Sequence, residues 1–338
     1  MNKNKLQADF VSILEAIYSL EQPADTWLKQ IMSVTALALE AGVGVGGILY
    51  RLGKDPLITL DLIDGIGVPD GWVDVGVALH ATPDLQQGIK RSYETMLCAD
   101  IMELSRLVPN FDVAETYHEN WQMRGGMILN GCDISGAGAC LHLFAREPFK
   151  VSRPRRTLLT RLATHLATAY RLHRRLNNQG PAAGVEAILT PRGRIEHVER
   201  AANSDEARAN LKEAADMQRR ARGRIRKDTP DEAIELWKGL VAGRWTLVDR
   251  YESDGKRYIV ARENTPLTRS AQPLSEREKQ VVALGSLGRT NKLIAYELGI
   301  AHATVRVLFA RAARKLGVQS RPELIARFQQ SRDSSASC

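Results

Sequence analysis

The sequence predicts a multidomain protein with an α+β N-terminal domain, a small α+β middle domain and an all-α C-terminal domain of four helices. The length of 338 residues allows two or three domains of ordinary size. Two stretches rich in small and polar residues divide the chain: NNQGPAAG at 177–184 and NTPLTRSAQP at 264–273. Apolar periodicity differs between the parts that they separate. We therefore expect domains at residues 1–176, 185–263 and 270–330.

Charge differs strongly along the chain. Residues 1–149 hold 10 basic and 19 acidic side chains, a net charge of −9, whereas residues 150–228 hold 19 and 8, a net of +11. Residues 274–330 hold 10 and 4, a net of +6. Basic regions favour a polyanionic partner, although a basic stretch also occurs as a solvated helix face.

Several protein classes do not fit this sequence. It has no uninterrupted apolar run near 18 residues, so no transmembrane helix is expected. Asp9 and Glu15 interrupt the N-terminal apolar stretch, which is unlike a secretory signal. The cysteines are too few for a disulfide scaffold: Cys98, Cys132, Cys140 and Cys338. We expect a cytoplasmic protein without a membrane partner.

The N-terminal segment alternates helical and strand patterns. Helices are expected at 6–20, 27–39, 86–96 and 154–176, and strands at 46–52, 57–63, 126–132 and 139–145. This order, with a helical middle between two strand pairs, resembles a GAF-type sensor domain. The resemblance implies either a small-molecule ligand held in a cup over the sheet or a scaffold for dimerisation.

The long helix at 154–176 carries apolar residues at heptad-like spacing. They are Leu159, Leu162, Leu166, Ala169, His173 and Leu176. Two interpretations remain open. The stripe packs onto the sheet of its own domain, or it forms a parallel helix pair in a homodimer.

The middle segment begins with a strand-turn-strand at 187–198 and ends with a hairpin at 245–251 and 257–261, turned at Asp254-Gly255. Helices are expected at 204–225 and 230–241, the second capped by Thr229. The opening resembles that of a shortened PAS-type domain. Five arginines lie near the end of the first helix: Arg219, Arg220, Arg222, Arg224 and Arg226. The helix dipole favours cations at this end, and contact with a DNA backbone is an alternative role.

The C-terminal segment carries the sharpest pattern. Ser275 and Glu278 form the spacing of a capping box, and Gly288 ends the helix that they begin. Thr290 caps a second short helix, which Gly299 ends. A third helix is expected from 302 to 316 and a fourth from Arg321. Short helices with a glycine turn before the third are typical of a helix-turn-helix, whose third helix enters the major groove of DNA.

These residues resemble the LuxR-type DNA-binding domain. The resemblance covers about 50 residues and rests on Arg277-Glu278, Gly288, Asn291-Lys292, Ile294-Ala295, Leu298-Gly299-Ile300, Thr304-Val305-Arg306, Lys315-Leu316-Gly317-Val318, Arg321 and Glu323-Leu324. Three positions depart from the family pattern: Leu293 replaces an acid, Ala301 a hydroxyl residue, and Leu308 a frequent histidine. We expect Leu308 to be a core substitution, and Ala301 to cost about 1 kcal/mol of helix capping.

The expected DNA contacts lie on the outward face of the third helix and at the start of the second. Arg306 is placed to reach a guanine edge, and Val307 to meet a thymine methyl group. The start of the second helix is a natural phosphate site. The complete set is Thr290, Asn291, Lys292, His302, Thr304, Arg306, Val307, Arg311, Arg314 and Lys315.

Other motifs favour neither an enzyme nor a cofactor protein. Gly42, Gly44 and Gly47 satisfy GxGxxG, but a helix precedes them and a strand follows, the reverse of a dinucleotide site. Cys140 and His142 alternate on one strand without a CxxC or HxxxH pair, so buried packing is favoured over metal or haem ligation. We predict a non-enzyme without a cofactor.

The sequence therefore predicts a sequence-specific, DNA-binding transcription regulator with an N-terminal sensory or dimerisation region. Its expected partners are double-stranded DNA, a second copy of the chain, RNA polymerase and an unknown small-molecule ligand of the GAF-like domain. The alternative is a protein-interaction regulator whose helix-turn-helix has lost its DNA affinity. In a further alternative, the front end is primarily a ligand sensor and DNA binding is constitutive.

Overall fold

The computed structural model describes residues 8–39, 42–108, 111–148, 151–199, 202–251, 256–264 and 274–334. The chain divides into two compact units. The first contains residues 1–132, 136–183 and 217–237, and the second contains 133–135, 184–216 and 238–338. Regions with sheets precede a helical C-terminal region, as predicted. The expected Asp254-Gly255 turn, residues 265–273 of the linker and Cys338 lie outside the described residues.

The first unit is built on a five-stranded antiparallel sheet. Its strands are β1 (Gly44–Leu52), β2 (Ile58–Ile66), β3 (Cys98–Asp100), β4 (Gly125–Cys132) and β5 (Ala137–Ala145), in the order β2-β1-β5-β4-β3. Both predicted strand pairs are present. The short edge strand β3 was not predicted.

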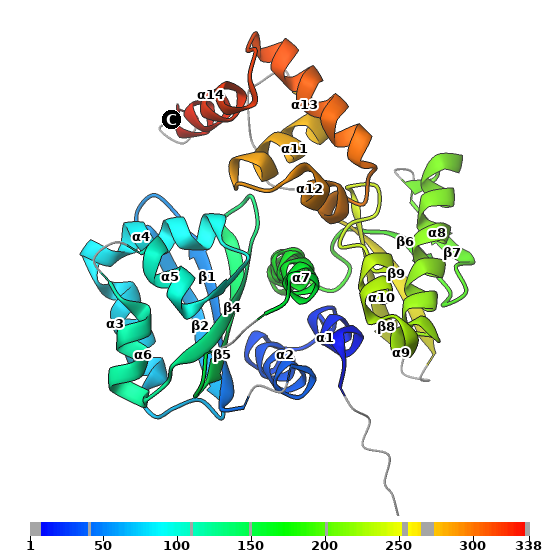
Figure 1. The fold of residues 1–338 in the computed structure, drawn as a ribbon. Coiled ribbons are helices and arrows are strands. Elements are labelled where there is room, and N and C mark those ends of the chain that lie inside the picture. Colours follow the sequence, from blue (N-terminus) through cyan, green and yellow to red (C-terminus); the bar gives the residue numbers. More distant parts are fainter. Residues whose placement is uncertain are drawn as a thin grey trace, which may run out of the picture. The chain divides into compact units, whose positions relative to one another are not determined.

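Helices cover both faces of this sheet (Figure 1). One face packs against α2 (Ala24–Ala38) and α7 (Arg153–Gln179), with α1 (Phe10–Ile17) beside them. The other face carries α3 (Trp72–Ala81), α4 (Pro83–Thr95), α5 (Ile101–Leu107) and α6 (Val113–Trp121). These four helices enclose a core with the sheet, in which Trp72 and Tyr93 of the helices pack with Ile48, Ile128 and Phe144 of the strands.

The apolar stripe of α7 faces inward. Each residue of the proposed seam, from Leu159 to Leu176, is at most 8% exposed. Helix α7 packs so closely on β4 that a Cβ at Gly131 would overlap the carbonyl oxygen of Ala163. The interpretation of this stripe as a dimer seam is therefore wrong, because these side chains are already buried within the first unit, against the sheet and, for His173, against the Trp27 ring of α2.

A buried asparagine joins three elements of the first unit. Asn130 on β4 has no exposed surface. Its Oδ1 accepts a hydrogen bond from the Tyr50 hydroxyl at 2.6 Å, and its Nδ2 donates to the carbonyl oxygens of Tyr93 and Met96 at 2.8 and 3.0 Å. The side chain thereby fixes β1 and the end of α4 against β4. All the polar atoms of this amide group are engaged in the interior.

Residues 217–237 belong to the first unit, although they follow part of the second unit in the chain. They include the end of α8 (Asp205–Ala221), α9 (Ile225–Asp228) and α10 (Pro230–Leu236). Trp237 is 1% exposed, and its ring stacks on that of Tyr18 with centroids 6.2 Å apart. The guanidinium carbon of Arg222 lies 4.4 Å from the centroid of the Trp237 ring.

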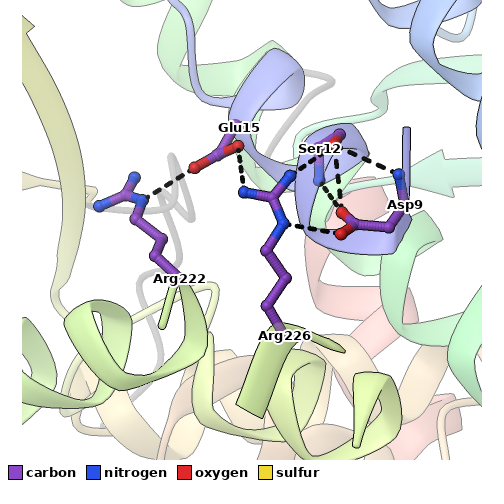
Figure 2. A network of polar contacts seen from close by, with 5 residues as sticks. All are labelled: Asp9, Ser12, Glu15, Arg222 and Arg226. Carbon is purple, nitrogen blue, oxygen red and sulfur yellow. Dashed lines mark hydrogen bonds and ion pairs between the residues drawn. The ribbon is translucent and has the colours of Figure 1, made fainter. Parts of the chain in front are cut away.

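Two arginines of this segment pair with helix α1, as Figure 2 shows. Arg226 donates to Asp9 Oδ2 at 2.7 Å, to Ser12 Oγ at 2.6 Å and to Glu15 Oε2 at 3.3 Å, while Arg222 donates to Glu15 Oε1 at 3.2 Å. Burial opposes ionisation of Asp9, but its bonds to Arg226 and Ser12 hold its pKa below the usual value. Arg222 and Arg226 thus pair with acids of their own unit, an interaction that the sequence analysis did not predict.

The second unit begins with a four-stranded antiparallel sheet. Its strands are β6 (Val185–Leu189), β7 (Ile195–Val198), β8 (Trp245–Tyr251) and β9 (Arg257–Glu263), in the order β7-β6-β9-β8. Leu211 and Ala215 of α8 are fully buried in a core shared with Leu189, Trp245 and Ile259 of the sheet. The strand-turn-strand and the hairpin were both predicted.

The predicted helix at 230–241 is shorter than expected. Helix α10 ends at Leu236, and the Thr229 side chain forms no bond to its backbone. The hydroxyl group of Thr229 instead donates to Glu232 Oε2 at 3.1 Å. The cap assigned to Thr229 is therefore wrong: this hydroxyl does not accept from the helix.

No single helix in the described part of the chain is long and apolar enough to cross a membrane. Helices α12 (Asn291–Leu298) and α13 (His302–Leu316) reach the length and apolar composition of a membrane span only together, as a pair bent by 106°. Their apolar side chains are largely buried in a common core, which accounts for that composition.

Candidate nucleic-acid interface

The last part of the second unit is a bundle of four helices: α11 (Glu276–Ser286), α12, α13 and α14 (Arg321–Ser334). The predicted capping box is present, because Ser275 Oγ accepts from the Glu278 N–H and Glu278 Oε2 accepts from the Ser275 N–H. Thr290 caps α12 by accepting from the Leu293 N–H at 3.3 Å. The third helix has the bounds that the sequence predicted.

A compact apolar core holds the bundle. It joins Val282 of α11, Ile294 of α12, Val305 and Phe309 of α13 and Phe328 of α14. Leu308 is 8% exposed in the same core, which confirms that this departure from the family pattern is a core substitution. The bend of 106° between α12 and α13 lies in the range of helix-turn-helix motifs.

Gly299 makes the turn for two reasons. Its φ of +62° lies in the left-handed region that favours glycine. A Cβ there would also overlap the carbonyl oxygen of Leu240, whose side chain is 3% exposed within the core of the bundle. The segment after α10 therefore packs against the bundle, and Gln280 Nε2 strengthens this by donating to the Gly243 carbonyl oxygen at 3.0 Å.

The outward face of α13 is open. Its exposed residues are His302, Ala303, Thr304, Arg306, Val307, Ala310, Arg311 and Arg314. Val307 is 47% exposed on this face. The arginines of this set form no ion pair within the described part of the chain. Cations and apolar groups side by side on a helix of this motif suit phosphate and base contacts.

The start of α12 places three predicted residues together. Thr290 and Lys292 are exposed, whereas Asn291 is half-buried. Arg321 donates to Asn291 Oδ1 at 2.9 Å and to the Arg289 carbonyl oxygen at 2.8 Å, and its guanidinium carbon lies 4.5 Å from the Phe309 ring centroid. The oxygen of the Asn291 side chain is thus held in place by Arg321.

Lys315 differs from the other predicted cations. Its Nζ donates to Glu278 Oε2 at 2.7 Å. Although burial opposes ionisation of Glu278, the bonds from Lys315 and Ser275 hold its pKa below the usual value. The ammonium group of Lys315 thus already joins the end of α13 to the start of α11, in addition to any contact with DNA.

Ala301 leaves the start of α13 without a side-chain cap, as the sequence predicted. Its backbone is extended, with φ −68° and ψ 145°, the geometry in which a serine side chain accepts from the first turn. We expect Ala301→Ser to raise the free energy of unfolding by about 1 kcal/mol. Urea titration of the purified variant measures this, and an unchanged or lower value would contradict the prediction. Ala303→Ser, on the same exposed turn, is the matched control.

Sequence reasoning missed the structural role of Arg321 and the packing of residues 238–243. The family motif includes Arg321, but the motif gives no hint that it holds Asn291. Nothing in the sequence places Leu240 in the core of the bundle, since the helical pattern extended through it. Gly299 was the one residue that could have indicated this close packing, but its glycine was explained by the turn alone.

The comparisons with known proteins agree with this geometry. Residues 272–328 match the model of "Bacterial regulatory proteins, luxR family", a description of regulators rather than of enzymes, as predicted. The "Transcriptional regulatory protein DesR" of Bacillus subtilis (strain 168) is 34% identical over 109 residues. These residues are 32% of this chain and 49% of that relative, so the chain spans about half the length of the curated relative it matches.

Solved structures of Escherichia coli SdiA are similar only at low scores. One, in space group P6522, covers 96% of both chains with 9% identity and a TM-score of 0.31. Another, "SdiA in complex with octanoyl-rac-glycerol", covers 98% of this chain and 97% of that one with 11% identity and a TM-score of 0.32. The family match of residues 272–328, together with the four helices and the glycine turn, identifies the C-terminal region as a luxR-family helix-turn-helix domain.

Proposed function

We propose that this protein is a sequence-specific, DNA-binding transcription regulator that binds double-stranded DNA through α13 and the start of α12. The observation that carries the proposal is the open face of α13, where Arg306 and Val307 are exposed beside further arginines. In this role, Arg306 reads a guanine edge and Val307 a thymine methyl group. The remaining predicted residues bind phosphates and set the position of α13.

The proposal extends to the rest of the chain. Residues 1–176 act as a GAF-like sensory and dimerisation domain, residues 185–263 as a PAS-like module and residues 270–330 as the reader. The sheet order of the first unit and its helices on both faces support the first assignment. A homodimer would present two readers to paired half-sites. Such a regulator acts in the cytoplasm, with RNA polymerase as a further partner.

Selection of bound sites from random duplex DNA by the full-length protein tests the function. We expect a defined sequence to be enriched, and the spacing of its half-sites to report a dimer. Failure to enrich any sequence, with no affinity for duplex DNA, would favour the protein-interaction alternative.

Salt dependence tests the phosphate contacts separately. On the selected site, the logarithm of the binding constant should fall linearly with the logarithm of salt concentration, with a slope of about −0.9 for each phosphate neutralised. Fluorescence anisotropy at four salt concentrations gives this slope. A flat response would exclude the proposed contacts of α12 and α13 with the DNA backbone.

A further inference from the structure

The first unit contains a cavity between its sheet and helices α3 to α6. It holds about 640 Å³ of space between the surrounding side chains, a volume that includes its open mouth. Its walls are almost wholly apolar and include Trp72, Leu79, Ile89, Phe111, Trp121 and Ile128. No acidic side chain, lysine or arginine lines it within the described residues.

One of the two histidines in the wall is fully engaged. His80 lies with its Nδ1 2.7 Å from the Gly76 carbonyl oxygen, to which it donates. Its Nε2 therefore accepts from the Tyr93 hydroxyl at 2.8 Å. Burial lowers the pKa of His80, so the ring is neutral near pH 7. Neither ring nitrogen is left for a ligand.

The second histidine has one nitrogen to spare. The Tyr117 hydroxyl lies 2.9 Å from His142 Nδ1. A tyrosine hydroxyl can donate to a ring nitrogen, and we assign that direction to the bond between Tyr117 and His142 Nδ1. The neutral ring then carries its own proton on Nε2.

This Nε2 is buried and has no hydrogen-bond partner in the described part of the chain. It is the only such side-chain atom among the residues that line the cavity. Burial, followed by the nearby His80, lowers the pKa of His142 to about 3, so the ring stays neutral. A buried donor left unpaired is costly, and a ligand with an acceptor removes that cost.

We propose that the cavity binds an uncharged, largely apolar small molecule whose carbonyl or ether oxygen accepts a hydrogen bond from His142 Nε2. The proposal rests on the sensory role of the first unit and names the class of ligand. A charged ligand is disfavoured because its burial would need a partner of opposite charge, which the described wall does not offer.

Three probes of similar size test two points separately: the preference for an uncharged ligand and the hydrogen bond from His142 Nε2. Acetophenone carries a carbonyl oxygen, α-methylstyrene replaces that oxygen with a CH₂ group, and benzoate carries a charge. Their affinities for the full-length protein without DNA are measured by ligand-detected NMR. We expect acetophenone and α-methylstyrene to bind and benzoate not to bind. No binding of the two neutral probes, or tightest binding of benzoate, would overturn the proposal.

The variant His142→Phe tests the hydrogen bond. The affinity ratio of acetophenone to α-methylstyrene should fall about tenfold relative to wild type, the upper range for one hydrogen bond. Comparing ratios cancels the different solvation of the two probes. His118→Phe, an exposed position on the same helix as Tyr117, should leave the ratio unchanged. An unchanged ratio in His142→Phe would overturn the assigned bond.

A wild-type measurement covers the case in which that variant does not fold. The ¹⁵N resonances of the His142 ring should shift with acetophenone and much less with α-methylstyrene, and equal shifts would count against the bond. The proposed DNA function is tested without these probes. A protein that selects a DNA site but binds no neutral probe would refute the ligand class alone.

Discussion

Arg306→Ala is expected to weaken binding to the selected DNA site by about 1–3 kcal/mol and to relax base preference at one position. The reason is its place on the open face of α13, where a guanidinium group can donate to both acceptors of a guanine. Affinities for the selected site and for its single-base variants, measured at two salt concentrations, give both quantities. Arg124→Ala, an exposed arginine of the first unit, is the control and should change neither.

Lys292→Ala is expected to affect DNA binding in a different way from Arg306→Ala. This exposed lysine stands on the first turn of α12, so we expect weaker binding to all sequences alike and a salt slope reduced by about 1. If Arg306→Ala weakened every sequence equally while Lys292→Ala changed base preference, the proposed orientation of α13 on DNA would be reversed. If neither variant changed affinity, the protein-interaction alternative would gain support.

Asn130→Leu is expected to destabilise the first unit by about 3–5 kcal/mol. The substitution leaves the Tyr50 hydroxyl without its acceptor and two carbonyl oxygens without their donor, and each buried unpaired group costs about 1–3 kcal/mol. Native-state hydrogen exchange of the β4 amides reports this unit by itself.

The control for this variant is Asn120→Leu on the exposed end of α6, where the side chain donates to a carbonyl one turn earlier. We expect a change within about 0.5 kcal/mol there. A loss below about 1 kcal/mol in Asn130→Leu would mean that the network contributes less than its burial implies.

The elements with strong local signals were predictable from the sequence. The capping box of Ser275 and Glu278, the Thr290 cap and the glycines at 288, 299 and 317 are short-range rules, and the structure follows them. Strand alternation likewise placed both strand pairs of the first sheet. Exposure of the α13 face followed from helical periodicity, because the buried positions were identifiable.

The remaining features depend on residues far apart in the chain. The α7 stripe has the same spacing whether it faces a sheet or a second helix, so periodicity did not decide between them. The partners of Arg226 lie more than 200 positions earlier, at Asp9 and Ser12. In the cavity, the spare nitrogen of His142 became visible only when Tyr117 was seen to occupy the other one.

The return of residues 217–237 to the first unit constrains recombination between regulators of this architecture. A chimaera joined in the polar stretch near Gly180 would separate Asp9 and Glu15 from Arg226, and Tyr18 from Trp237. Its N-terminal part would then expose the face that these side chains cover. An exchange point after Trp237 keeps both sets of partners on one parental sequence. That exchange divides the second sheet instead, because β6 and β7 would come from one parent and β8 and β9 from the other. Neither point therefore leaves the partners of both units on one parental sequence.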